Sequence, residues 1–173
     1  VVANPVFPYP EYAQSYLNIN KIFEKWDMTK GLTSLGEKVV EKMLELGMLV
    51  DLVHCTPAGR RRVMELASHH KKEHLVFASH GGAFEVNNIP YNLTDNEIRW
   101  IGEHGGVIGV IFMNYWISPV DSGMGLQHIE RTMSHIAKVG GIDAVGLGTD
   151  FDGFTDPPDE LLDMSQLPRM THY

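Results

Sequence analysis

The fold is decided by the stretch Gly47-Met-Leu-Val-Asp-Leu-Val-His-Cys-Thr-Pro57, which holds a complete transition from a strand to a helix. Residues 48–53 are a short apolar run, typical of a strand buried on both faces of a parallel sheet. His54 follows the end of this strand. Thr56 is suited to cap a helix and Pro57 to open it, because proline at the first helical position loses only an amide that would have no partner.

Helical patterns flank this stretch on both sides. Before it, apolar residues recur at helical spacing, Ser34 and Glu37 are spaced as a capping box, and Gly47 is suited to end the helix. After it, apolar residues at positions 63, 64, 66 and 67 predict the inner stripe of a second helix. The three arginines at positions 60–62 are expected on the solvated outer side of that helix.

The same succession recurs along the rest of the chain. Strands are expected at residues 75–79, 107–113 and 144–149. Thr94 and Glu97 form a second capping box for a helix that runs to residue 104, another helix covers residues 126–140, and a last one begins near Ser165. Helix and strand therefore alternate four times, which indicates a parallel α/β fold, either a barrel or a doubly wound sheet.

Residues 1–30 have a different pattern. Pro5, Pro8 and Pro10 are interspersed with aromatic residues without a clear period. We expect a lead-in segment there, with a short helix within residues 12–26, followed by one α/β domain over residues 31–173.

Composition excludes several classes of function. The chain has 173 residues, of which 43% are hydrophobic and 21% charged, as in an ordinary globular domain. Its net charge of −8 argues against nucleic acid and anionic membrane surfaces as partners. No apolar run approaches the ~18 residues that a membrane span requires. The single cysteine, Cys55, fits a reducing compartment and favours a cytoplasmic location.

Three predicted strands end in a residue suited to metal or proton chemistry, namely His54, His80 and Asp150. The carboxyl ends of parallel strands open onto one face, so these side chains are expected to converge there. Two imidazoles and a carboxylate at one face can bind a divalent metal and carry a proton. The alternative is that each is an ordinary hydrogen-bonded or capping residue at the end of its strand.

Several sequence motifs of the chain, taken together, resemble those of the membrane (renal) dipeptidase family of zinc metallopeptidases. The resemblance runs in order from about residue 31 to about residue 168. It is carried by Gly31-Leu-Thr-Ser-Leu-Gly36, Gly47-Met-Leu-Val-Asp-Leu-Val-His54, Ala78-Ser-His80, Asn92-Leu-Thr-Asp95, Gly105-Gly-Val-Ile-Gly-Val110, His135 and Gly146-Leu-Gly-Thr-Asp-Phe-Asp-Gly153.

The resemblance implies a (β/α)8 TIM-barrel metallohydrolase with two zinc ions, which cleaves dipeptides or related amides by a metal-bound hydroxide. It places His54 and His80 as ligands of one zinc, and Asp150 beside the other zinc as the residue that manages protons. Tyr91, Asn114 and Tyr115 are candidates for contacts with a dipeptide or small amide substrate, although Tyr115 and the neighbouring Trp116 can equally pack in the core. A homodimer is a candidate assembly.

Three departures from the family pattern qualify this reading. No His-x-Asp pair occurs in the chain, the metal-bridging Glu has no counterpart, and Pro90-Tyr91 stands where the family often has a carboxylate-binding Arg. The first two lead us to expect only the C-terminal part of a barrel, about four of its strand-helix units. The alternatives are a non-catalytic α/β module that binds a ligand or partner, and a metal-independent isomerase or lyase with Asp150 as its base.

The remaining reactive side chains have simpler interpretations. Cys55 is expected to be a buried, idle thiol, because it points away from His54 on an extended chain. The histidines of the predicted helices, His104, His128 and His135, are expected to lie on helix surfaces or in packing contacts. No Gly-x-Ser-x-Gly motif accompanies the His80-Gly-Gly segment, so that segment has no serine to serve as the oxyanion loop of an esterase.

Overall fold

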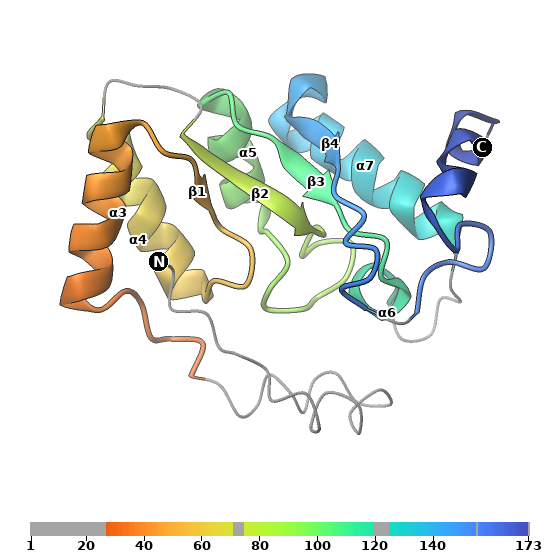
Figure 1. Ribbon diagram of the computed structural model, residues 1–173, viewed down its shortest axis with the longest axis horizontal. Helices are drawn as coiled ribbons and strands as arrows, with labels where there is room; N and C mark the ends of the chain where they lie inside the picture. The colour runs from red at the N-terminus through yellow and green to blue at the C-terminus, as the bar shows by residue number, and fades with distance from the viewer. Residues whose placement is uncertain (1–26, 71–74, 120–124, 155, 173) are drawn as a thin grey trace.

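A computed structural model describes residues 27–70, 75–119, 125–154 and 156–172 of the chain (Figure 1). The helix predicted within residues 12–26 lies outside these ranges. No helix within the described ranges has the length and apolarity needed to cross a membrane. The elements, in chain order, are α3 (Ser34–Leu46), β1 (Val50–Asp51), α4 (Pro57–Ser68), β2 (Val76–Gly81), α5 (Asp95–Glu103), β3 (Ile108–Val110), α6 (Asn114–Ile117), α7 (Leu126–Gly140), η1 (Ile142–Ala144), β4 (Val145–Leu147) and η2 (Met164–His172).

Two helix starts are confirmed and one is shifted. Thr56 caps α4 with Pro57 in its first turn, and Thr94 and Glu97 form the predicted capping box of α5. At α3, however, the cap is Thr33 and not Ser34, because the Thr33 hydroxyl accepts from the amide of Gly36. The predicted Ser34–Glu37 capping box is therefore wrong by one residue.

The strands are shorter than predicted, because regular pairing stops before the extended backbone does. Residues 48–53 were expected as a strand, whereas β1 covers only Val50–Asp51. Single hydrogen bonds continue beyond the regular ladder, for example from the Leu52 amide to the Phe77 carbonyl and from the Ile111 amide to the Gly81 carbonyl. The element near Ser165 is the 3-10 helix η2, which contains Pro168 and so lacks one amide donor.

The four strands form one parallel sheet in the order β1-β2-β3-β4. A doubly wound sheet requires a reversal of strand order, and none occurs among the described strands. The parallel α/β prediction is therefore confirmed, and the sequential order is that of a barrel segment. All four carboxyl ends lie at the same edge of the sheet (Figure 1).

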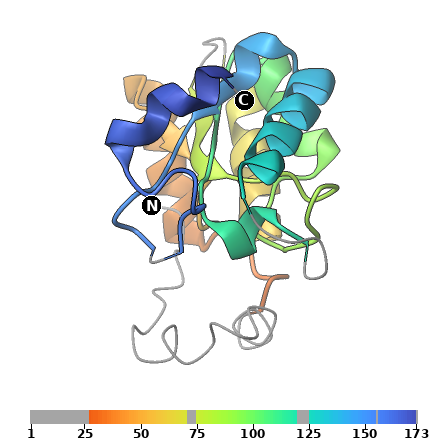
Figure 2. The same cartoon turned by 90° about the vertical axis from the view of Figure 1, so that its right-hand side faces the viewer.

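The core lies between the sheet and the helices that cover one of its faces. Helices α5 and α7 pack against each other on that face, as the two perpendicular views show (Figures 1 and 2). Burying each aliphatic side chain there contributes about 1.5–3 kcal/mol. The buried strand and helix residues include Val50, Val76, Ala78, Ile108, Val110, Val63, Ile98, Ile101, Ile129 and Ile136.

Two glycines allow the strands to approach closely beside the carboxyl edge. A Cβ atom on Gly109 or on Gly148 would collide with the backbone carbonyl of Ser79. Any larger residue would therefore push β3 or the end of β4 away from β2. The main chain itself thus sets the spacing of the strands immediately before His80.

Candidate active site

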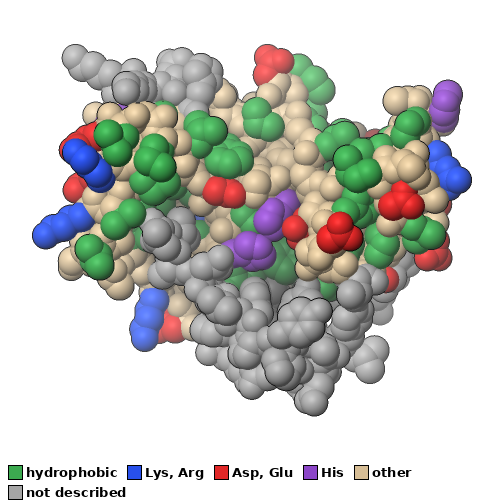
Figure 3. All heavy atoms as spheres, in the orientation of Figure 1, with side chains coloured by type: hydrophobic (Ala, Val, Ile, Leu, Met, Phe, Trp, Pro, Cys, Tyr) green, Lys and Arg blue, Asp and Glu red, His purple; other side chains and the backbone are tan. Residues whose placement is uncertain are grey.

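The structure brings together the three predicted strand-end residues, His54, His80 and Asp150, here called the strand-end trio. Nε2 of His80 lies 3.0 Å from Nε2 of His54 and 3.7 Å from Oδ2 of Asp150. Figure 3 shows histidine side chains together near the middle of this face, with acidic side chains on either side. Residues 96 positions apart in sequence thus share one site, because their strands end at the same edge.

The backbone at the trio is unusual. Among the described residues, the non-glycine residues with positive φ are His54 at 60°, Asp150 at 57° and Asp152 at 69°. Such left-handed conformations are uncommon outside glycine, and they concentrate at functional sites. Gly153 supports this arrangement, because a Cβ atom there would collide with the carboxylate of Asp150.

Ser79 orients the ring of His80, and Asp51 fixes the backbone beside the two histidines; sequence reasoning assigned neither residue a role. Oγ of Ser79 lies 3.0 Å from Nδ1 of His80. If Nδ1 donates this hydrogen bond, Nε2 is left as the free ligand atom, which is the usual arrangement around a metal-binding histidine. The Asp51 carboxylate accepts from the amides of Val53 and Ser79 at 3.1 Å and 3.0 Å, and so fixes the end of β1 to β2. Both residues lie within quoted motifs, which was the available signal.

The surroundings of His54 favour its neutral imidazole form. Burial, and then the nearby His80, lower the pKa of His54, while the carboxylates of Asp150 and Asp51 act in the opposite direction. Neutral imidazole is the form that binds zinc. Two ligands of one tetrahedral zinc, each about 2.0–2.1 Å from the ion, lie about 3.3 Å apart. The observed Nε2 separation of 3.0 Å is close to this value, so the two histidines fit one shared ion.

Aromatic side chains stand beside the trio. The ring of Tyr91 is 6.4 Å from that of His54 and 5.8 Å from that of Trp116, whose ring is 6.5 Å from His54. Tyr91 is buried, which raises the pKa of its hydroxyl to about 12. Tyr91 and Trp116 therefore form one wall next to His54.

The other two predicted substrate contacts are placed differently. Asn114 is buried, with its amide donating to the Pro157 carbonyl at 3.0 Å and accepting from the Gly125 amide at 3.2 Å. It thus ties the start of α6 to two loops. Tyr115 is half-buried and packs against the hydrophobic core. A role for either residue in substrate binding stays a prediction.

Arg60 contradicts its prediction. It was expected on a solvated helix face, but its side chain is buried and pairs with Glu97, with Nε 2.7 Å from Oε1. The sequence held a signal for this placement, because position 60 shares the inner helical stripe with Val63, Met64 and Ala67. The prediction followed the charge of Arg60, which favours exposure. The helical periodicity, which places position 60 on the buried side, was the correct guide.

Cys55 agrees with its prediction. It is buried, and burial raises the pKa of its thiol to about 12, so the reactive thiolate is not formed at neutral pH. Its side chain faces α4, where a Cβ atom on Gly59 would approach Sγ within 2.5 Å.

A second group of acidic and imidazole side chains lies away from the strand ends. Glu85, Asp95 and His135, here called the helix-side group, have ligand atoms that all lie within 4.8 Å of one another. Nε2 of His135 is 2.6 Å from Oδ1 of Asp95, and this hydrogen bond lowers the pKa of Asp95. His135, predicted as a surface or packing residue, thus joins α7 to the start of α5.

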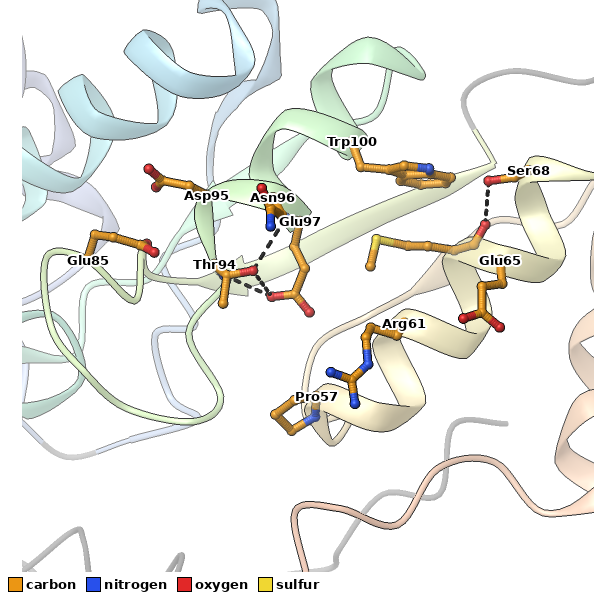
Figure 4. Close-up of a pocket in the computed structure, with 11 residues that line it drawn as sticks. Pro57, Arg61, Glu65, Ser68, Glu85, Thr94, Asp95, Asn96, Glu97 and Trp100 are labelled. Carbon is orange, nitrogen blue, oxygen red and sulfur yellow. Dashed lines mark hydrogen bonds between the residues drawn. The ribbon is translucent and has the colours of Figure 1, made fainter.

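A cavity of about 770 Å³ is also separate from the strand-end trio. It lies between α4 and α5, with Arg61 and Glu65 from one helix and Trp100 from the other (Figure 4). Glu97 borders it and is held by Thr94, whose amide donates to Oε2 at 2.8 Å. The cavity is therefore lined by the two helices and by residues that precede α5, whereas the trio lies at the ends of β1, β2 and β4.

A family model and a curated relative both match the chain. The model of the family described as membrane dipeptidase (peptidase family M19) matches residues 9–173. An uncharacterized protein from the pqqA 5' region of Klebsiella pneumoniae is 36% identical over 147 residues, which are 83% of this chain and 52% of that protein. The chain thus spans about half the length of this curated relative.

Solved structures show the same relationship. A dipeptidase AC metallopeptidase and a metallopeptidase from Rhodobacter sphaeroides, bound to a phosphinate mimic of the dipeptide L-Ala-D-Ala, are each 29% identical to the chain, with a TM-score of 0.73. Each match covers 83% of this chain and 40% of the other. The probable dipeptidase PvdM from Pseudomonas aeruginosa, 20% identical with a TM-score of 0.72, shares the fold over 82% of this chain and 48% of its own. The four-stranded sheet therefore corresponds to part of a barrel-like dipeptidase fold.

Proposed function

The chain belongs to the membrane dipeptidase family, peptidase family M19, and we propose that the protein hydrolyses dipeptides or related small amides with zinc as its cofactor. The observation that carries the proposal is the convergence of the strand-end trio. Two imidazole Nε2 atoms face each other at 3.0 Å, and a carboxylate oxygen lies 3.7 Å from one of them. Imidazole and carboxylate are residue types that bind zinc in proteins.

His54 and His80 are the residues that would hold the metal. Bound there, zinc supplies the Lewis acidity that polarises an amide carbonyl and lets a water ionise near neutral pH. Catalytic zinc usually has three protein ligands. The additional ligands and a second zinc ion are expected from the part of the family's domain that this chain does not span.

Asp150 is proposed as the group that moves protons. Its carboxylate can accept a proton from the attacking water and return it to the leaving amine, as general acid–base catalysis requires. Asp150 has left-handed backbone, Gly153 leaves space for its carboxylate, and Oδ2 lies 3.7 Å from Nε2 of His80. Its position therefore suits a proton carrier at the edge of the metal site.

Tyr91 is proposed to contact the substrate. It lies against His54 and Trp116, at the position where the family pattern often has an arginine. A tyrosine hydroxyl offers one neutral donor in place of a bidentate cation. We therefore propose that the substrate carboxylate is held less tightly here, and that small amides lacking this carboxylate are also accepted.

The test uses the full-length protein, purified and supplied with zinc. We expect bound zinc by elemental analysis, hydrolysis of a dipeptide panel that includes L-Ala-D-Ala, and loss of hydrolysis with a chelator that added zinc restores. His104→Ala is the matched control, because His104 stacks on Trp100 with ring centroids 4.0 Å apart, away from the trio. Absence of both zinc and hydrolysis after zinc addition would support a non-catalytic binding module instead.

A further inference from the structure

Arg60 is a buried cation with no free donor. Its guanidinium has five N–H groups, and its side chain is 2% exposed. Nε donates to Oε1 of Glu97 at 2.7 Å, and Nη2 donates to Oε2 of Glu97 at 3.2 Å. The other bonds all go to backbone carbonyls: from Nη1 to Cys55, Pro90 and Tyr91 at 3.1, 3.3 and 3.3 Å, and from Nη2 to Pro90 and Asn92 at 3.3 and 3.2 Å.

These carbonyls belong to two segments that border the strand-end trio. Cys55 directly follows His54, and residues 90–92 lie in the connection between β2 and α5. Carbonyl oxygens that converge on one point repel each other unless a donor lies between them, and a charged guanidinium is the strongest such donor in proteins. A single side chain of α4 therefore fixes the turn after β1 to the loop that carries Tyr91.

We propose that Arg60 is a positioning residue for substrate binding: through the carbonyls of residues 90–92 it holds the Tyr91 ring against His54 and Trp116. This inference rests on the proposed function for its catalytic consequence, but not for its structural one. Arg60 does not touch the substrate, because all of its donors are committed to the protein. It acts through Tyr91, whose main chain it binds and whose ring forms the wall beside His54.

Glu97 makes the arrangement more than a simple ion pair. Its carboxylate accepts from both the amide and the hydroxyl of Thr94 at 2.8 and 3.0 Å, so that it also closes the capping box of α5. The start of α5, the 90–92 loop and the turn at Cys55 are thus held at one centre. Removing only one of the two charges would leave the other buried and unpaired, which is strongly destabilising.

The chain contains a matched control pair on the same helix. Arg62 binds Glu37 with the same two-pronged geometry, at 2.7 Å from Nε and 3.3 Å from Nη2. Their side chains are 37% and 34% exposed, and the described bonds of this arginine go to carboxylates and not to carbonyls of the 90–92 loop. The two pairs therefore differ in burial and in the backbone that they hold.

The test compares two double variants of the full-length protein, Arg60→Met with Glu97→Gln, and Arg62→Met with Glu37→Gln. Both remove a whole ion pair, and glutamine at position 97 keeps an oxygen for the Thr94 amide. Tyr91 is observed directly by 19F NMR of protein labelled with 3-fluorotyrosine, with its signal assigned through Tyr91→Phe. Folding is checked by circular dichroism and urea unfolding.

We expect the first double variant to shift or broaden the Tyr91 signal toward that of a solvated tyrosine, and the control pair to leave it unchanged. For dipeptide hydrolysis, KM is expected to rise about tenfold while kcat and zinc content change little, because binding geometry is lost and the metal site is kept. A purely structural role would instead change the urea midpoint without this separation of KM from kcat.

An unchanged Tyr91 signal in the folded Arg60→Met, Glu97→Gln protein would overturn the inference, whatever its activity. If that variant does not fold, Arg60→Lys decides, since lysine keeps the charge beside Glu97 but lacks the planar fork that reaches the carbonyls; an unchanged signal there overturns the inference equally. If the wild-type protein hydrolyses no dipeptide, the proposed function fails, while the 19F comparison still tests the placement of Tyr91.

Discussion

The strand-end trio and the helix-side group contain the same kinds of side chain but have different bonding. In the helix-side group, the imidazole of His135 is already hydrogen-bonded to Asp95 at 2.6 Å. In the trio, two imidazoles face each other and the carboxylate oxygen stays 3.7 Å from His80. The close contact of the first group joins an imidazole to a carboxylate, whereas that of the second joins two imidazoles. The same residue types therefore occur in two different arrangements, and the proposed function assigns the metal to the one in which the two imidazoles meet.

The largest expected difference between the two groups is in metal content. His54→Ala or His80→Ala should abolish zinc binding at the trio and reduce dipeptide hydrolysis to background, because each removes one of two facing ligands. His135→Ala should retain both, and serves as the control. Elemental analysis and hydrolysis rates measure the outcome. Loss of zinc from His135→Ala, with zinc kept in His54→Ala, would reverse the assignment of the two groups.

Asp150→Asn tests whether the trio's carboxylate differs in role from its histidines. Asparagine keeps the size of the side chain but removes the proton-accepting charge, so kcat should fall by about 10²- to 10⁴-fold while zinc is retained. Steady-state kinetics and metal analysis on the same preparation separate the two effects. Equal loss of zinc in Asp150→Asn and His80→Ala would mean that Asp150 is mainly a ligand. Asp95→Asn, its counterpart in the helix-side group, should leave kcat unchanged.

Ser79→Ala tests the orientation of His80 within the trio. The hydroxyl lies 3.0 Å from Nδ1, and losing the partner that orients a ligating histidine typically weakens metal binding by about 10- to 100-fold. The zinc dissociation constant, measured by competition with a chromophoric chelator, gives this effect. An affinity equal to that of wild type would show that packing alone orients the ring. Ser134→Ala, which removes an exposed hydroxyl of α7 bonded to Glu130, is the control.

The smallest expected effect is on the stability of the helix-side group. The hydrogen bond from His135 lowers the pKa of Asp95 below its ordinary value of 3.8, so the ionised form stabilises the fold above that value and its contribution disappears as pH falls through the folded-state pKa. Because the pair is partly exposed, Asp95→Asn should lower the free energy of unfolding by less than about 1 kcal/mol near pH 6. Urea unfolding at pH 6 and at pH 3 measures this, and the difference between wild type and variant should be smaller at the lower pH. A difference that is as large at pH 3 as at pH 6 would contradict the assignment.

Local signals predicted most of the fold, and contacts distant in sequence account for the errors. The caps at Thr56 and Thr94 depend on residues no more than three positions away, and both are confirmed. Arg60 depends on Glu97, 37 residues later, and no local pattern specifies that partner. The strand ends were predictable for two reasons. An apolar run marks each strand, and the carboxyl ends of parallel strands open onto one face, so the residue that follows each run lies on that face.

The sequence predicted which residues meet at the strand ends better than it predicted their hydrogen bonds and backbone conformation. That His54, His80 and Asp150 meet follows from topology, and the structure confirms that they lie together. The bond between Asp51 and the Ser79 amide joins residues 28 positions apart, so its existence depends on strand register, which the sequence does not specify. Left-handed backbone at His54 is equally invisible in a sequence, because only a few per cent of non-glycine residues adopt it and no local pattern marks which ones do.

The left-handed backbone at positions 54 and 150 restricts which residues evolution or a protein engineer can place there. Histidine, asparagine and aspartate tolerate this conformation better than other side chains, whereas β-branched residues strongly disfavour it. His54 and Asp150 therefore suit their positions in two ways: their side chains fit the proposed metal and proton chemistry, and their residue types tolerate the left-handed backbone. Retention of such residues among relatives would reflect backbone geometry as well as catalysis. An exchange between aspartate and asparagine is the change that alters the chemistry at position 150 while leaving the main chain as it is.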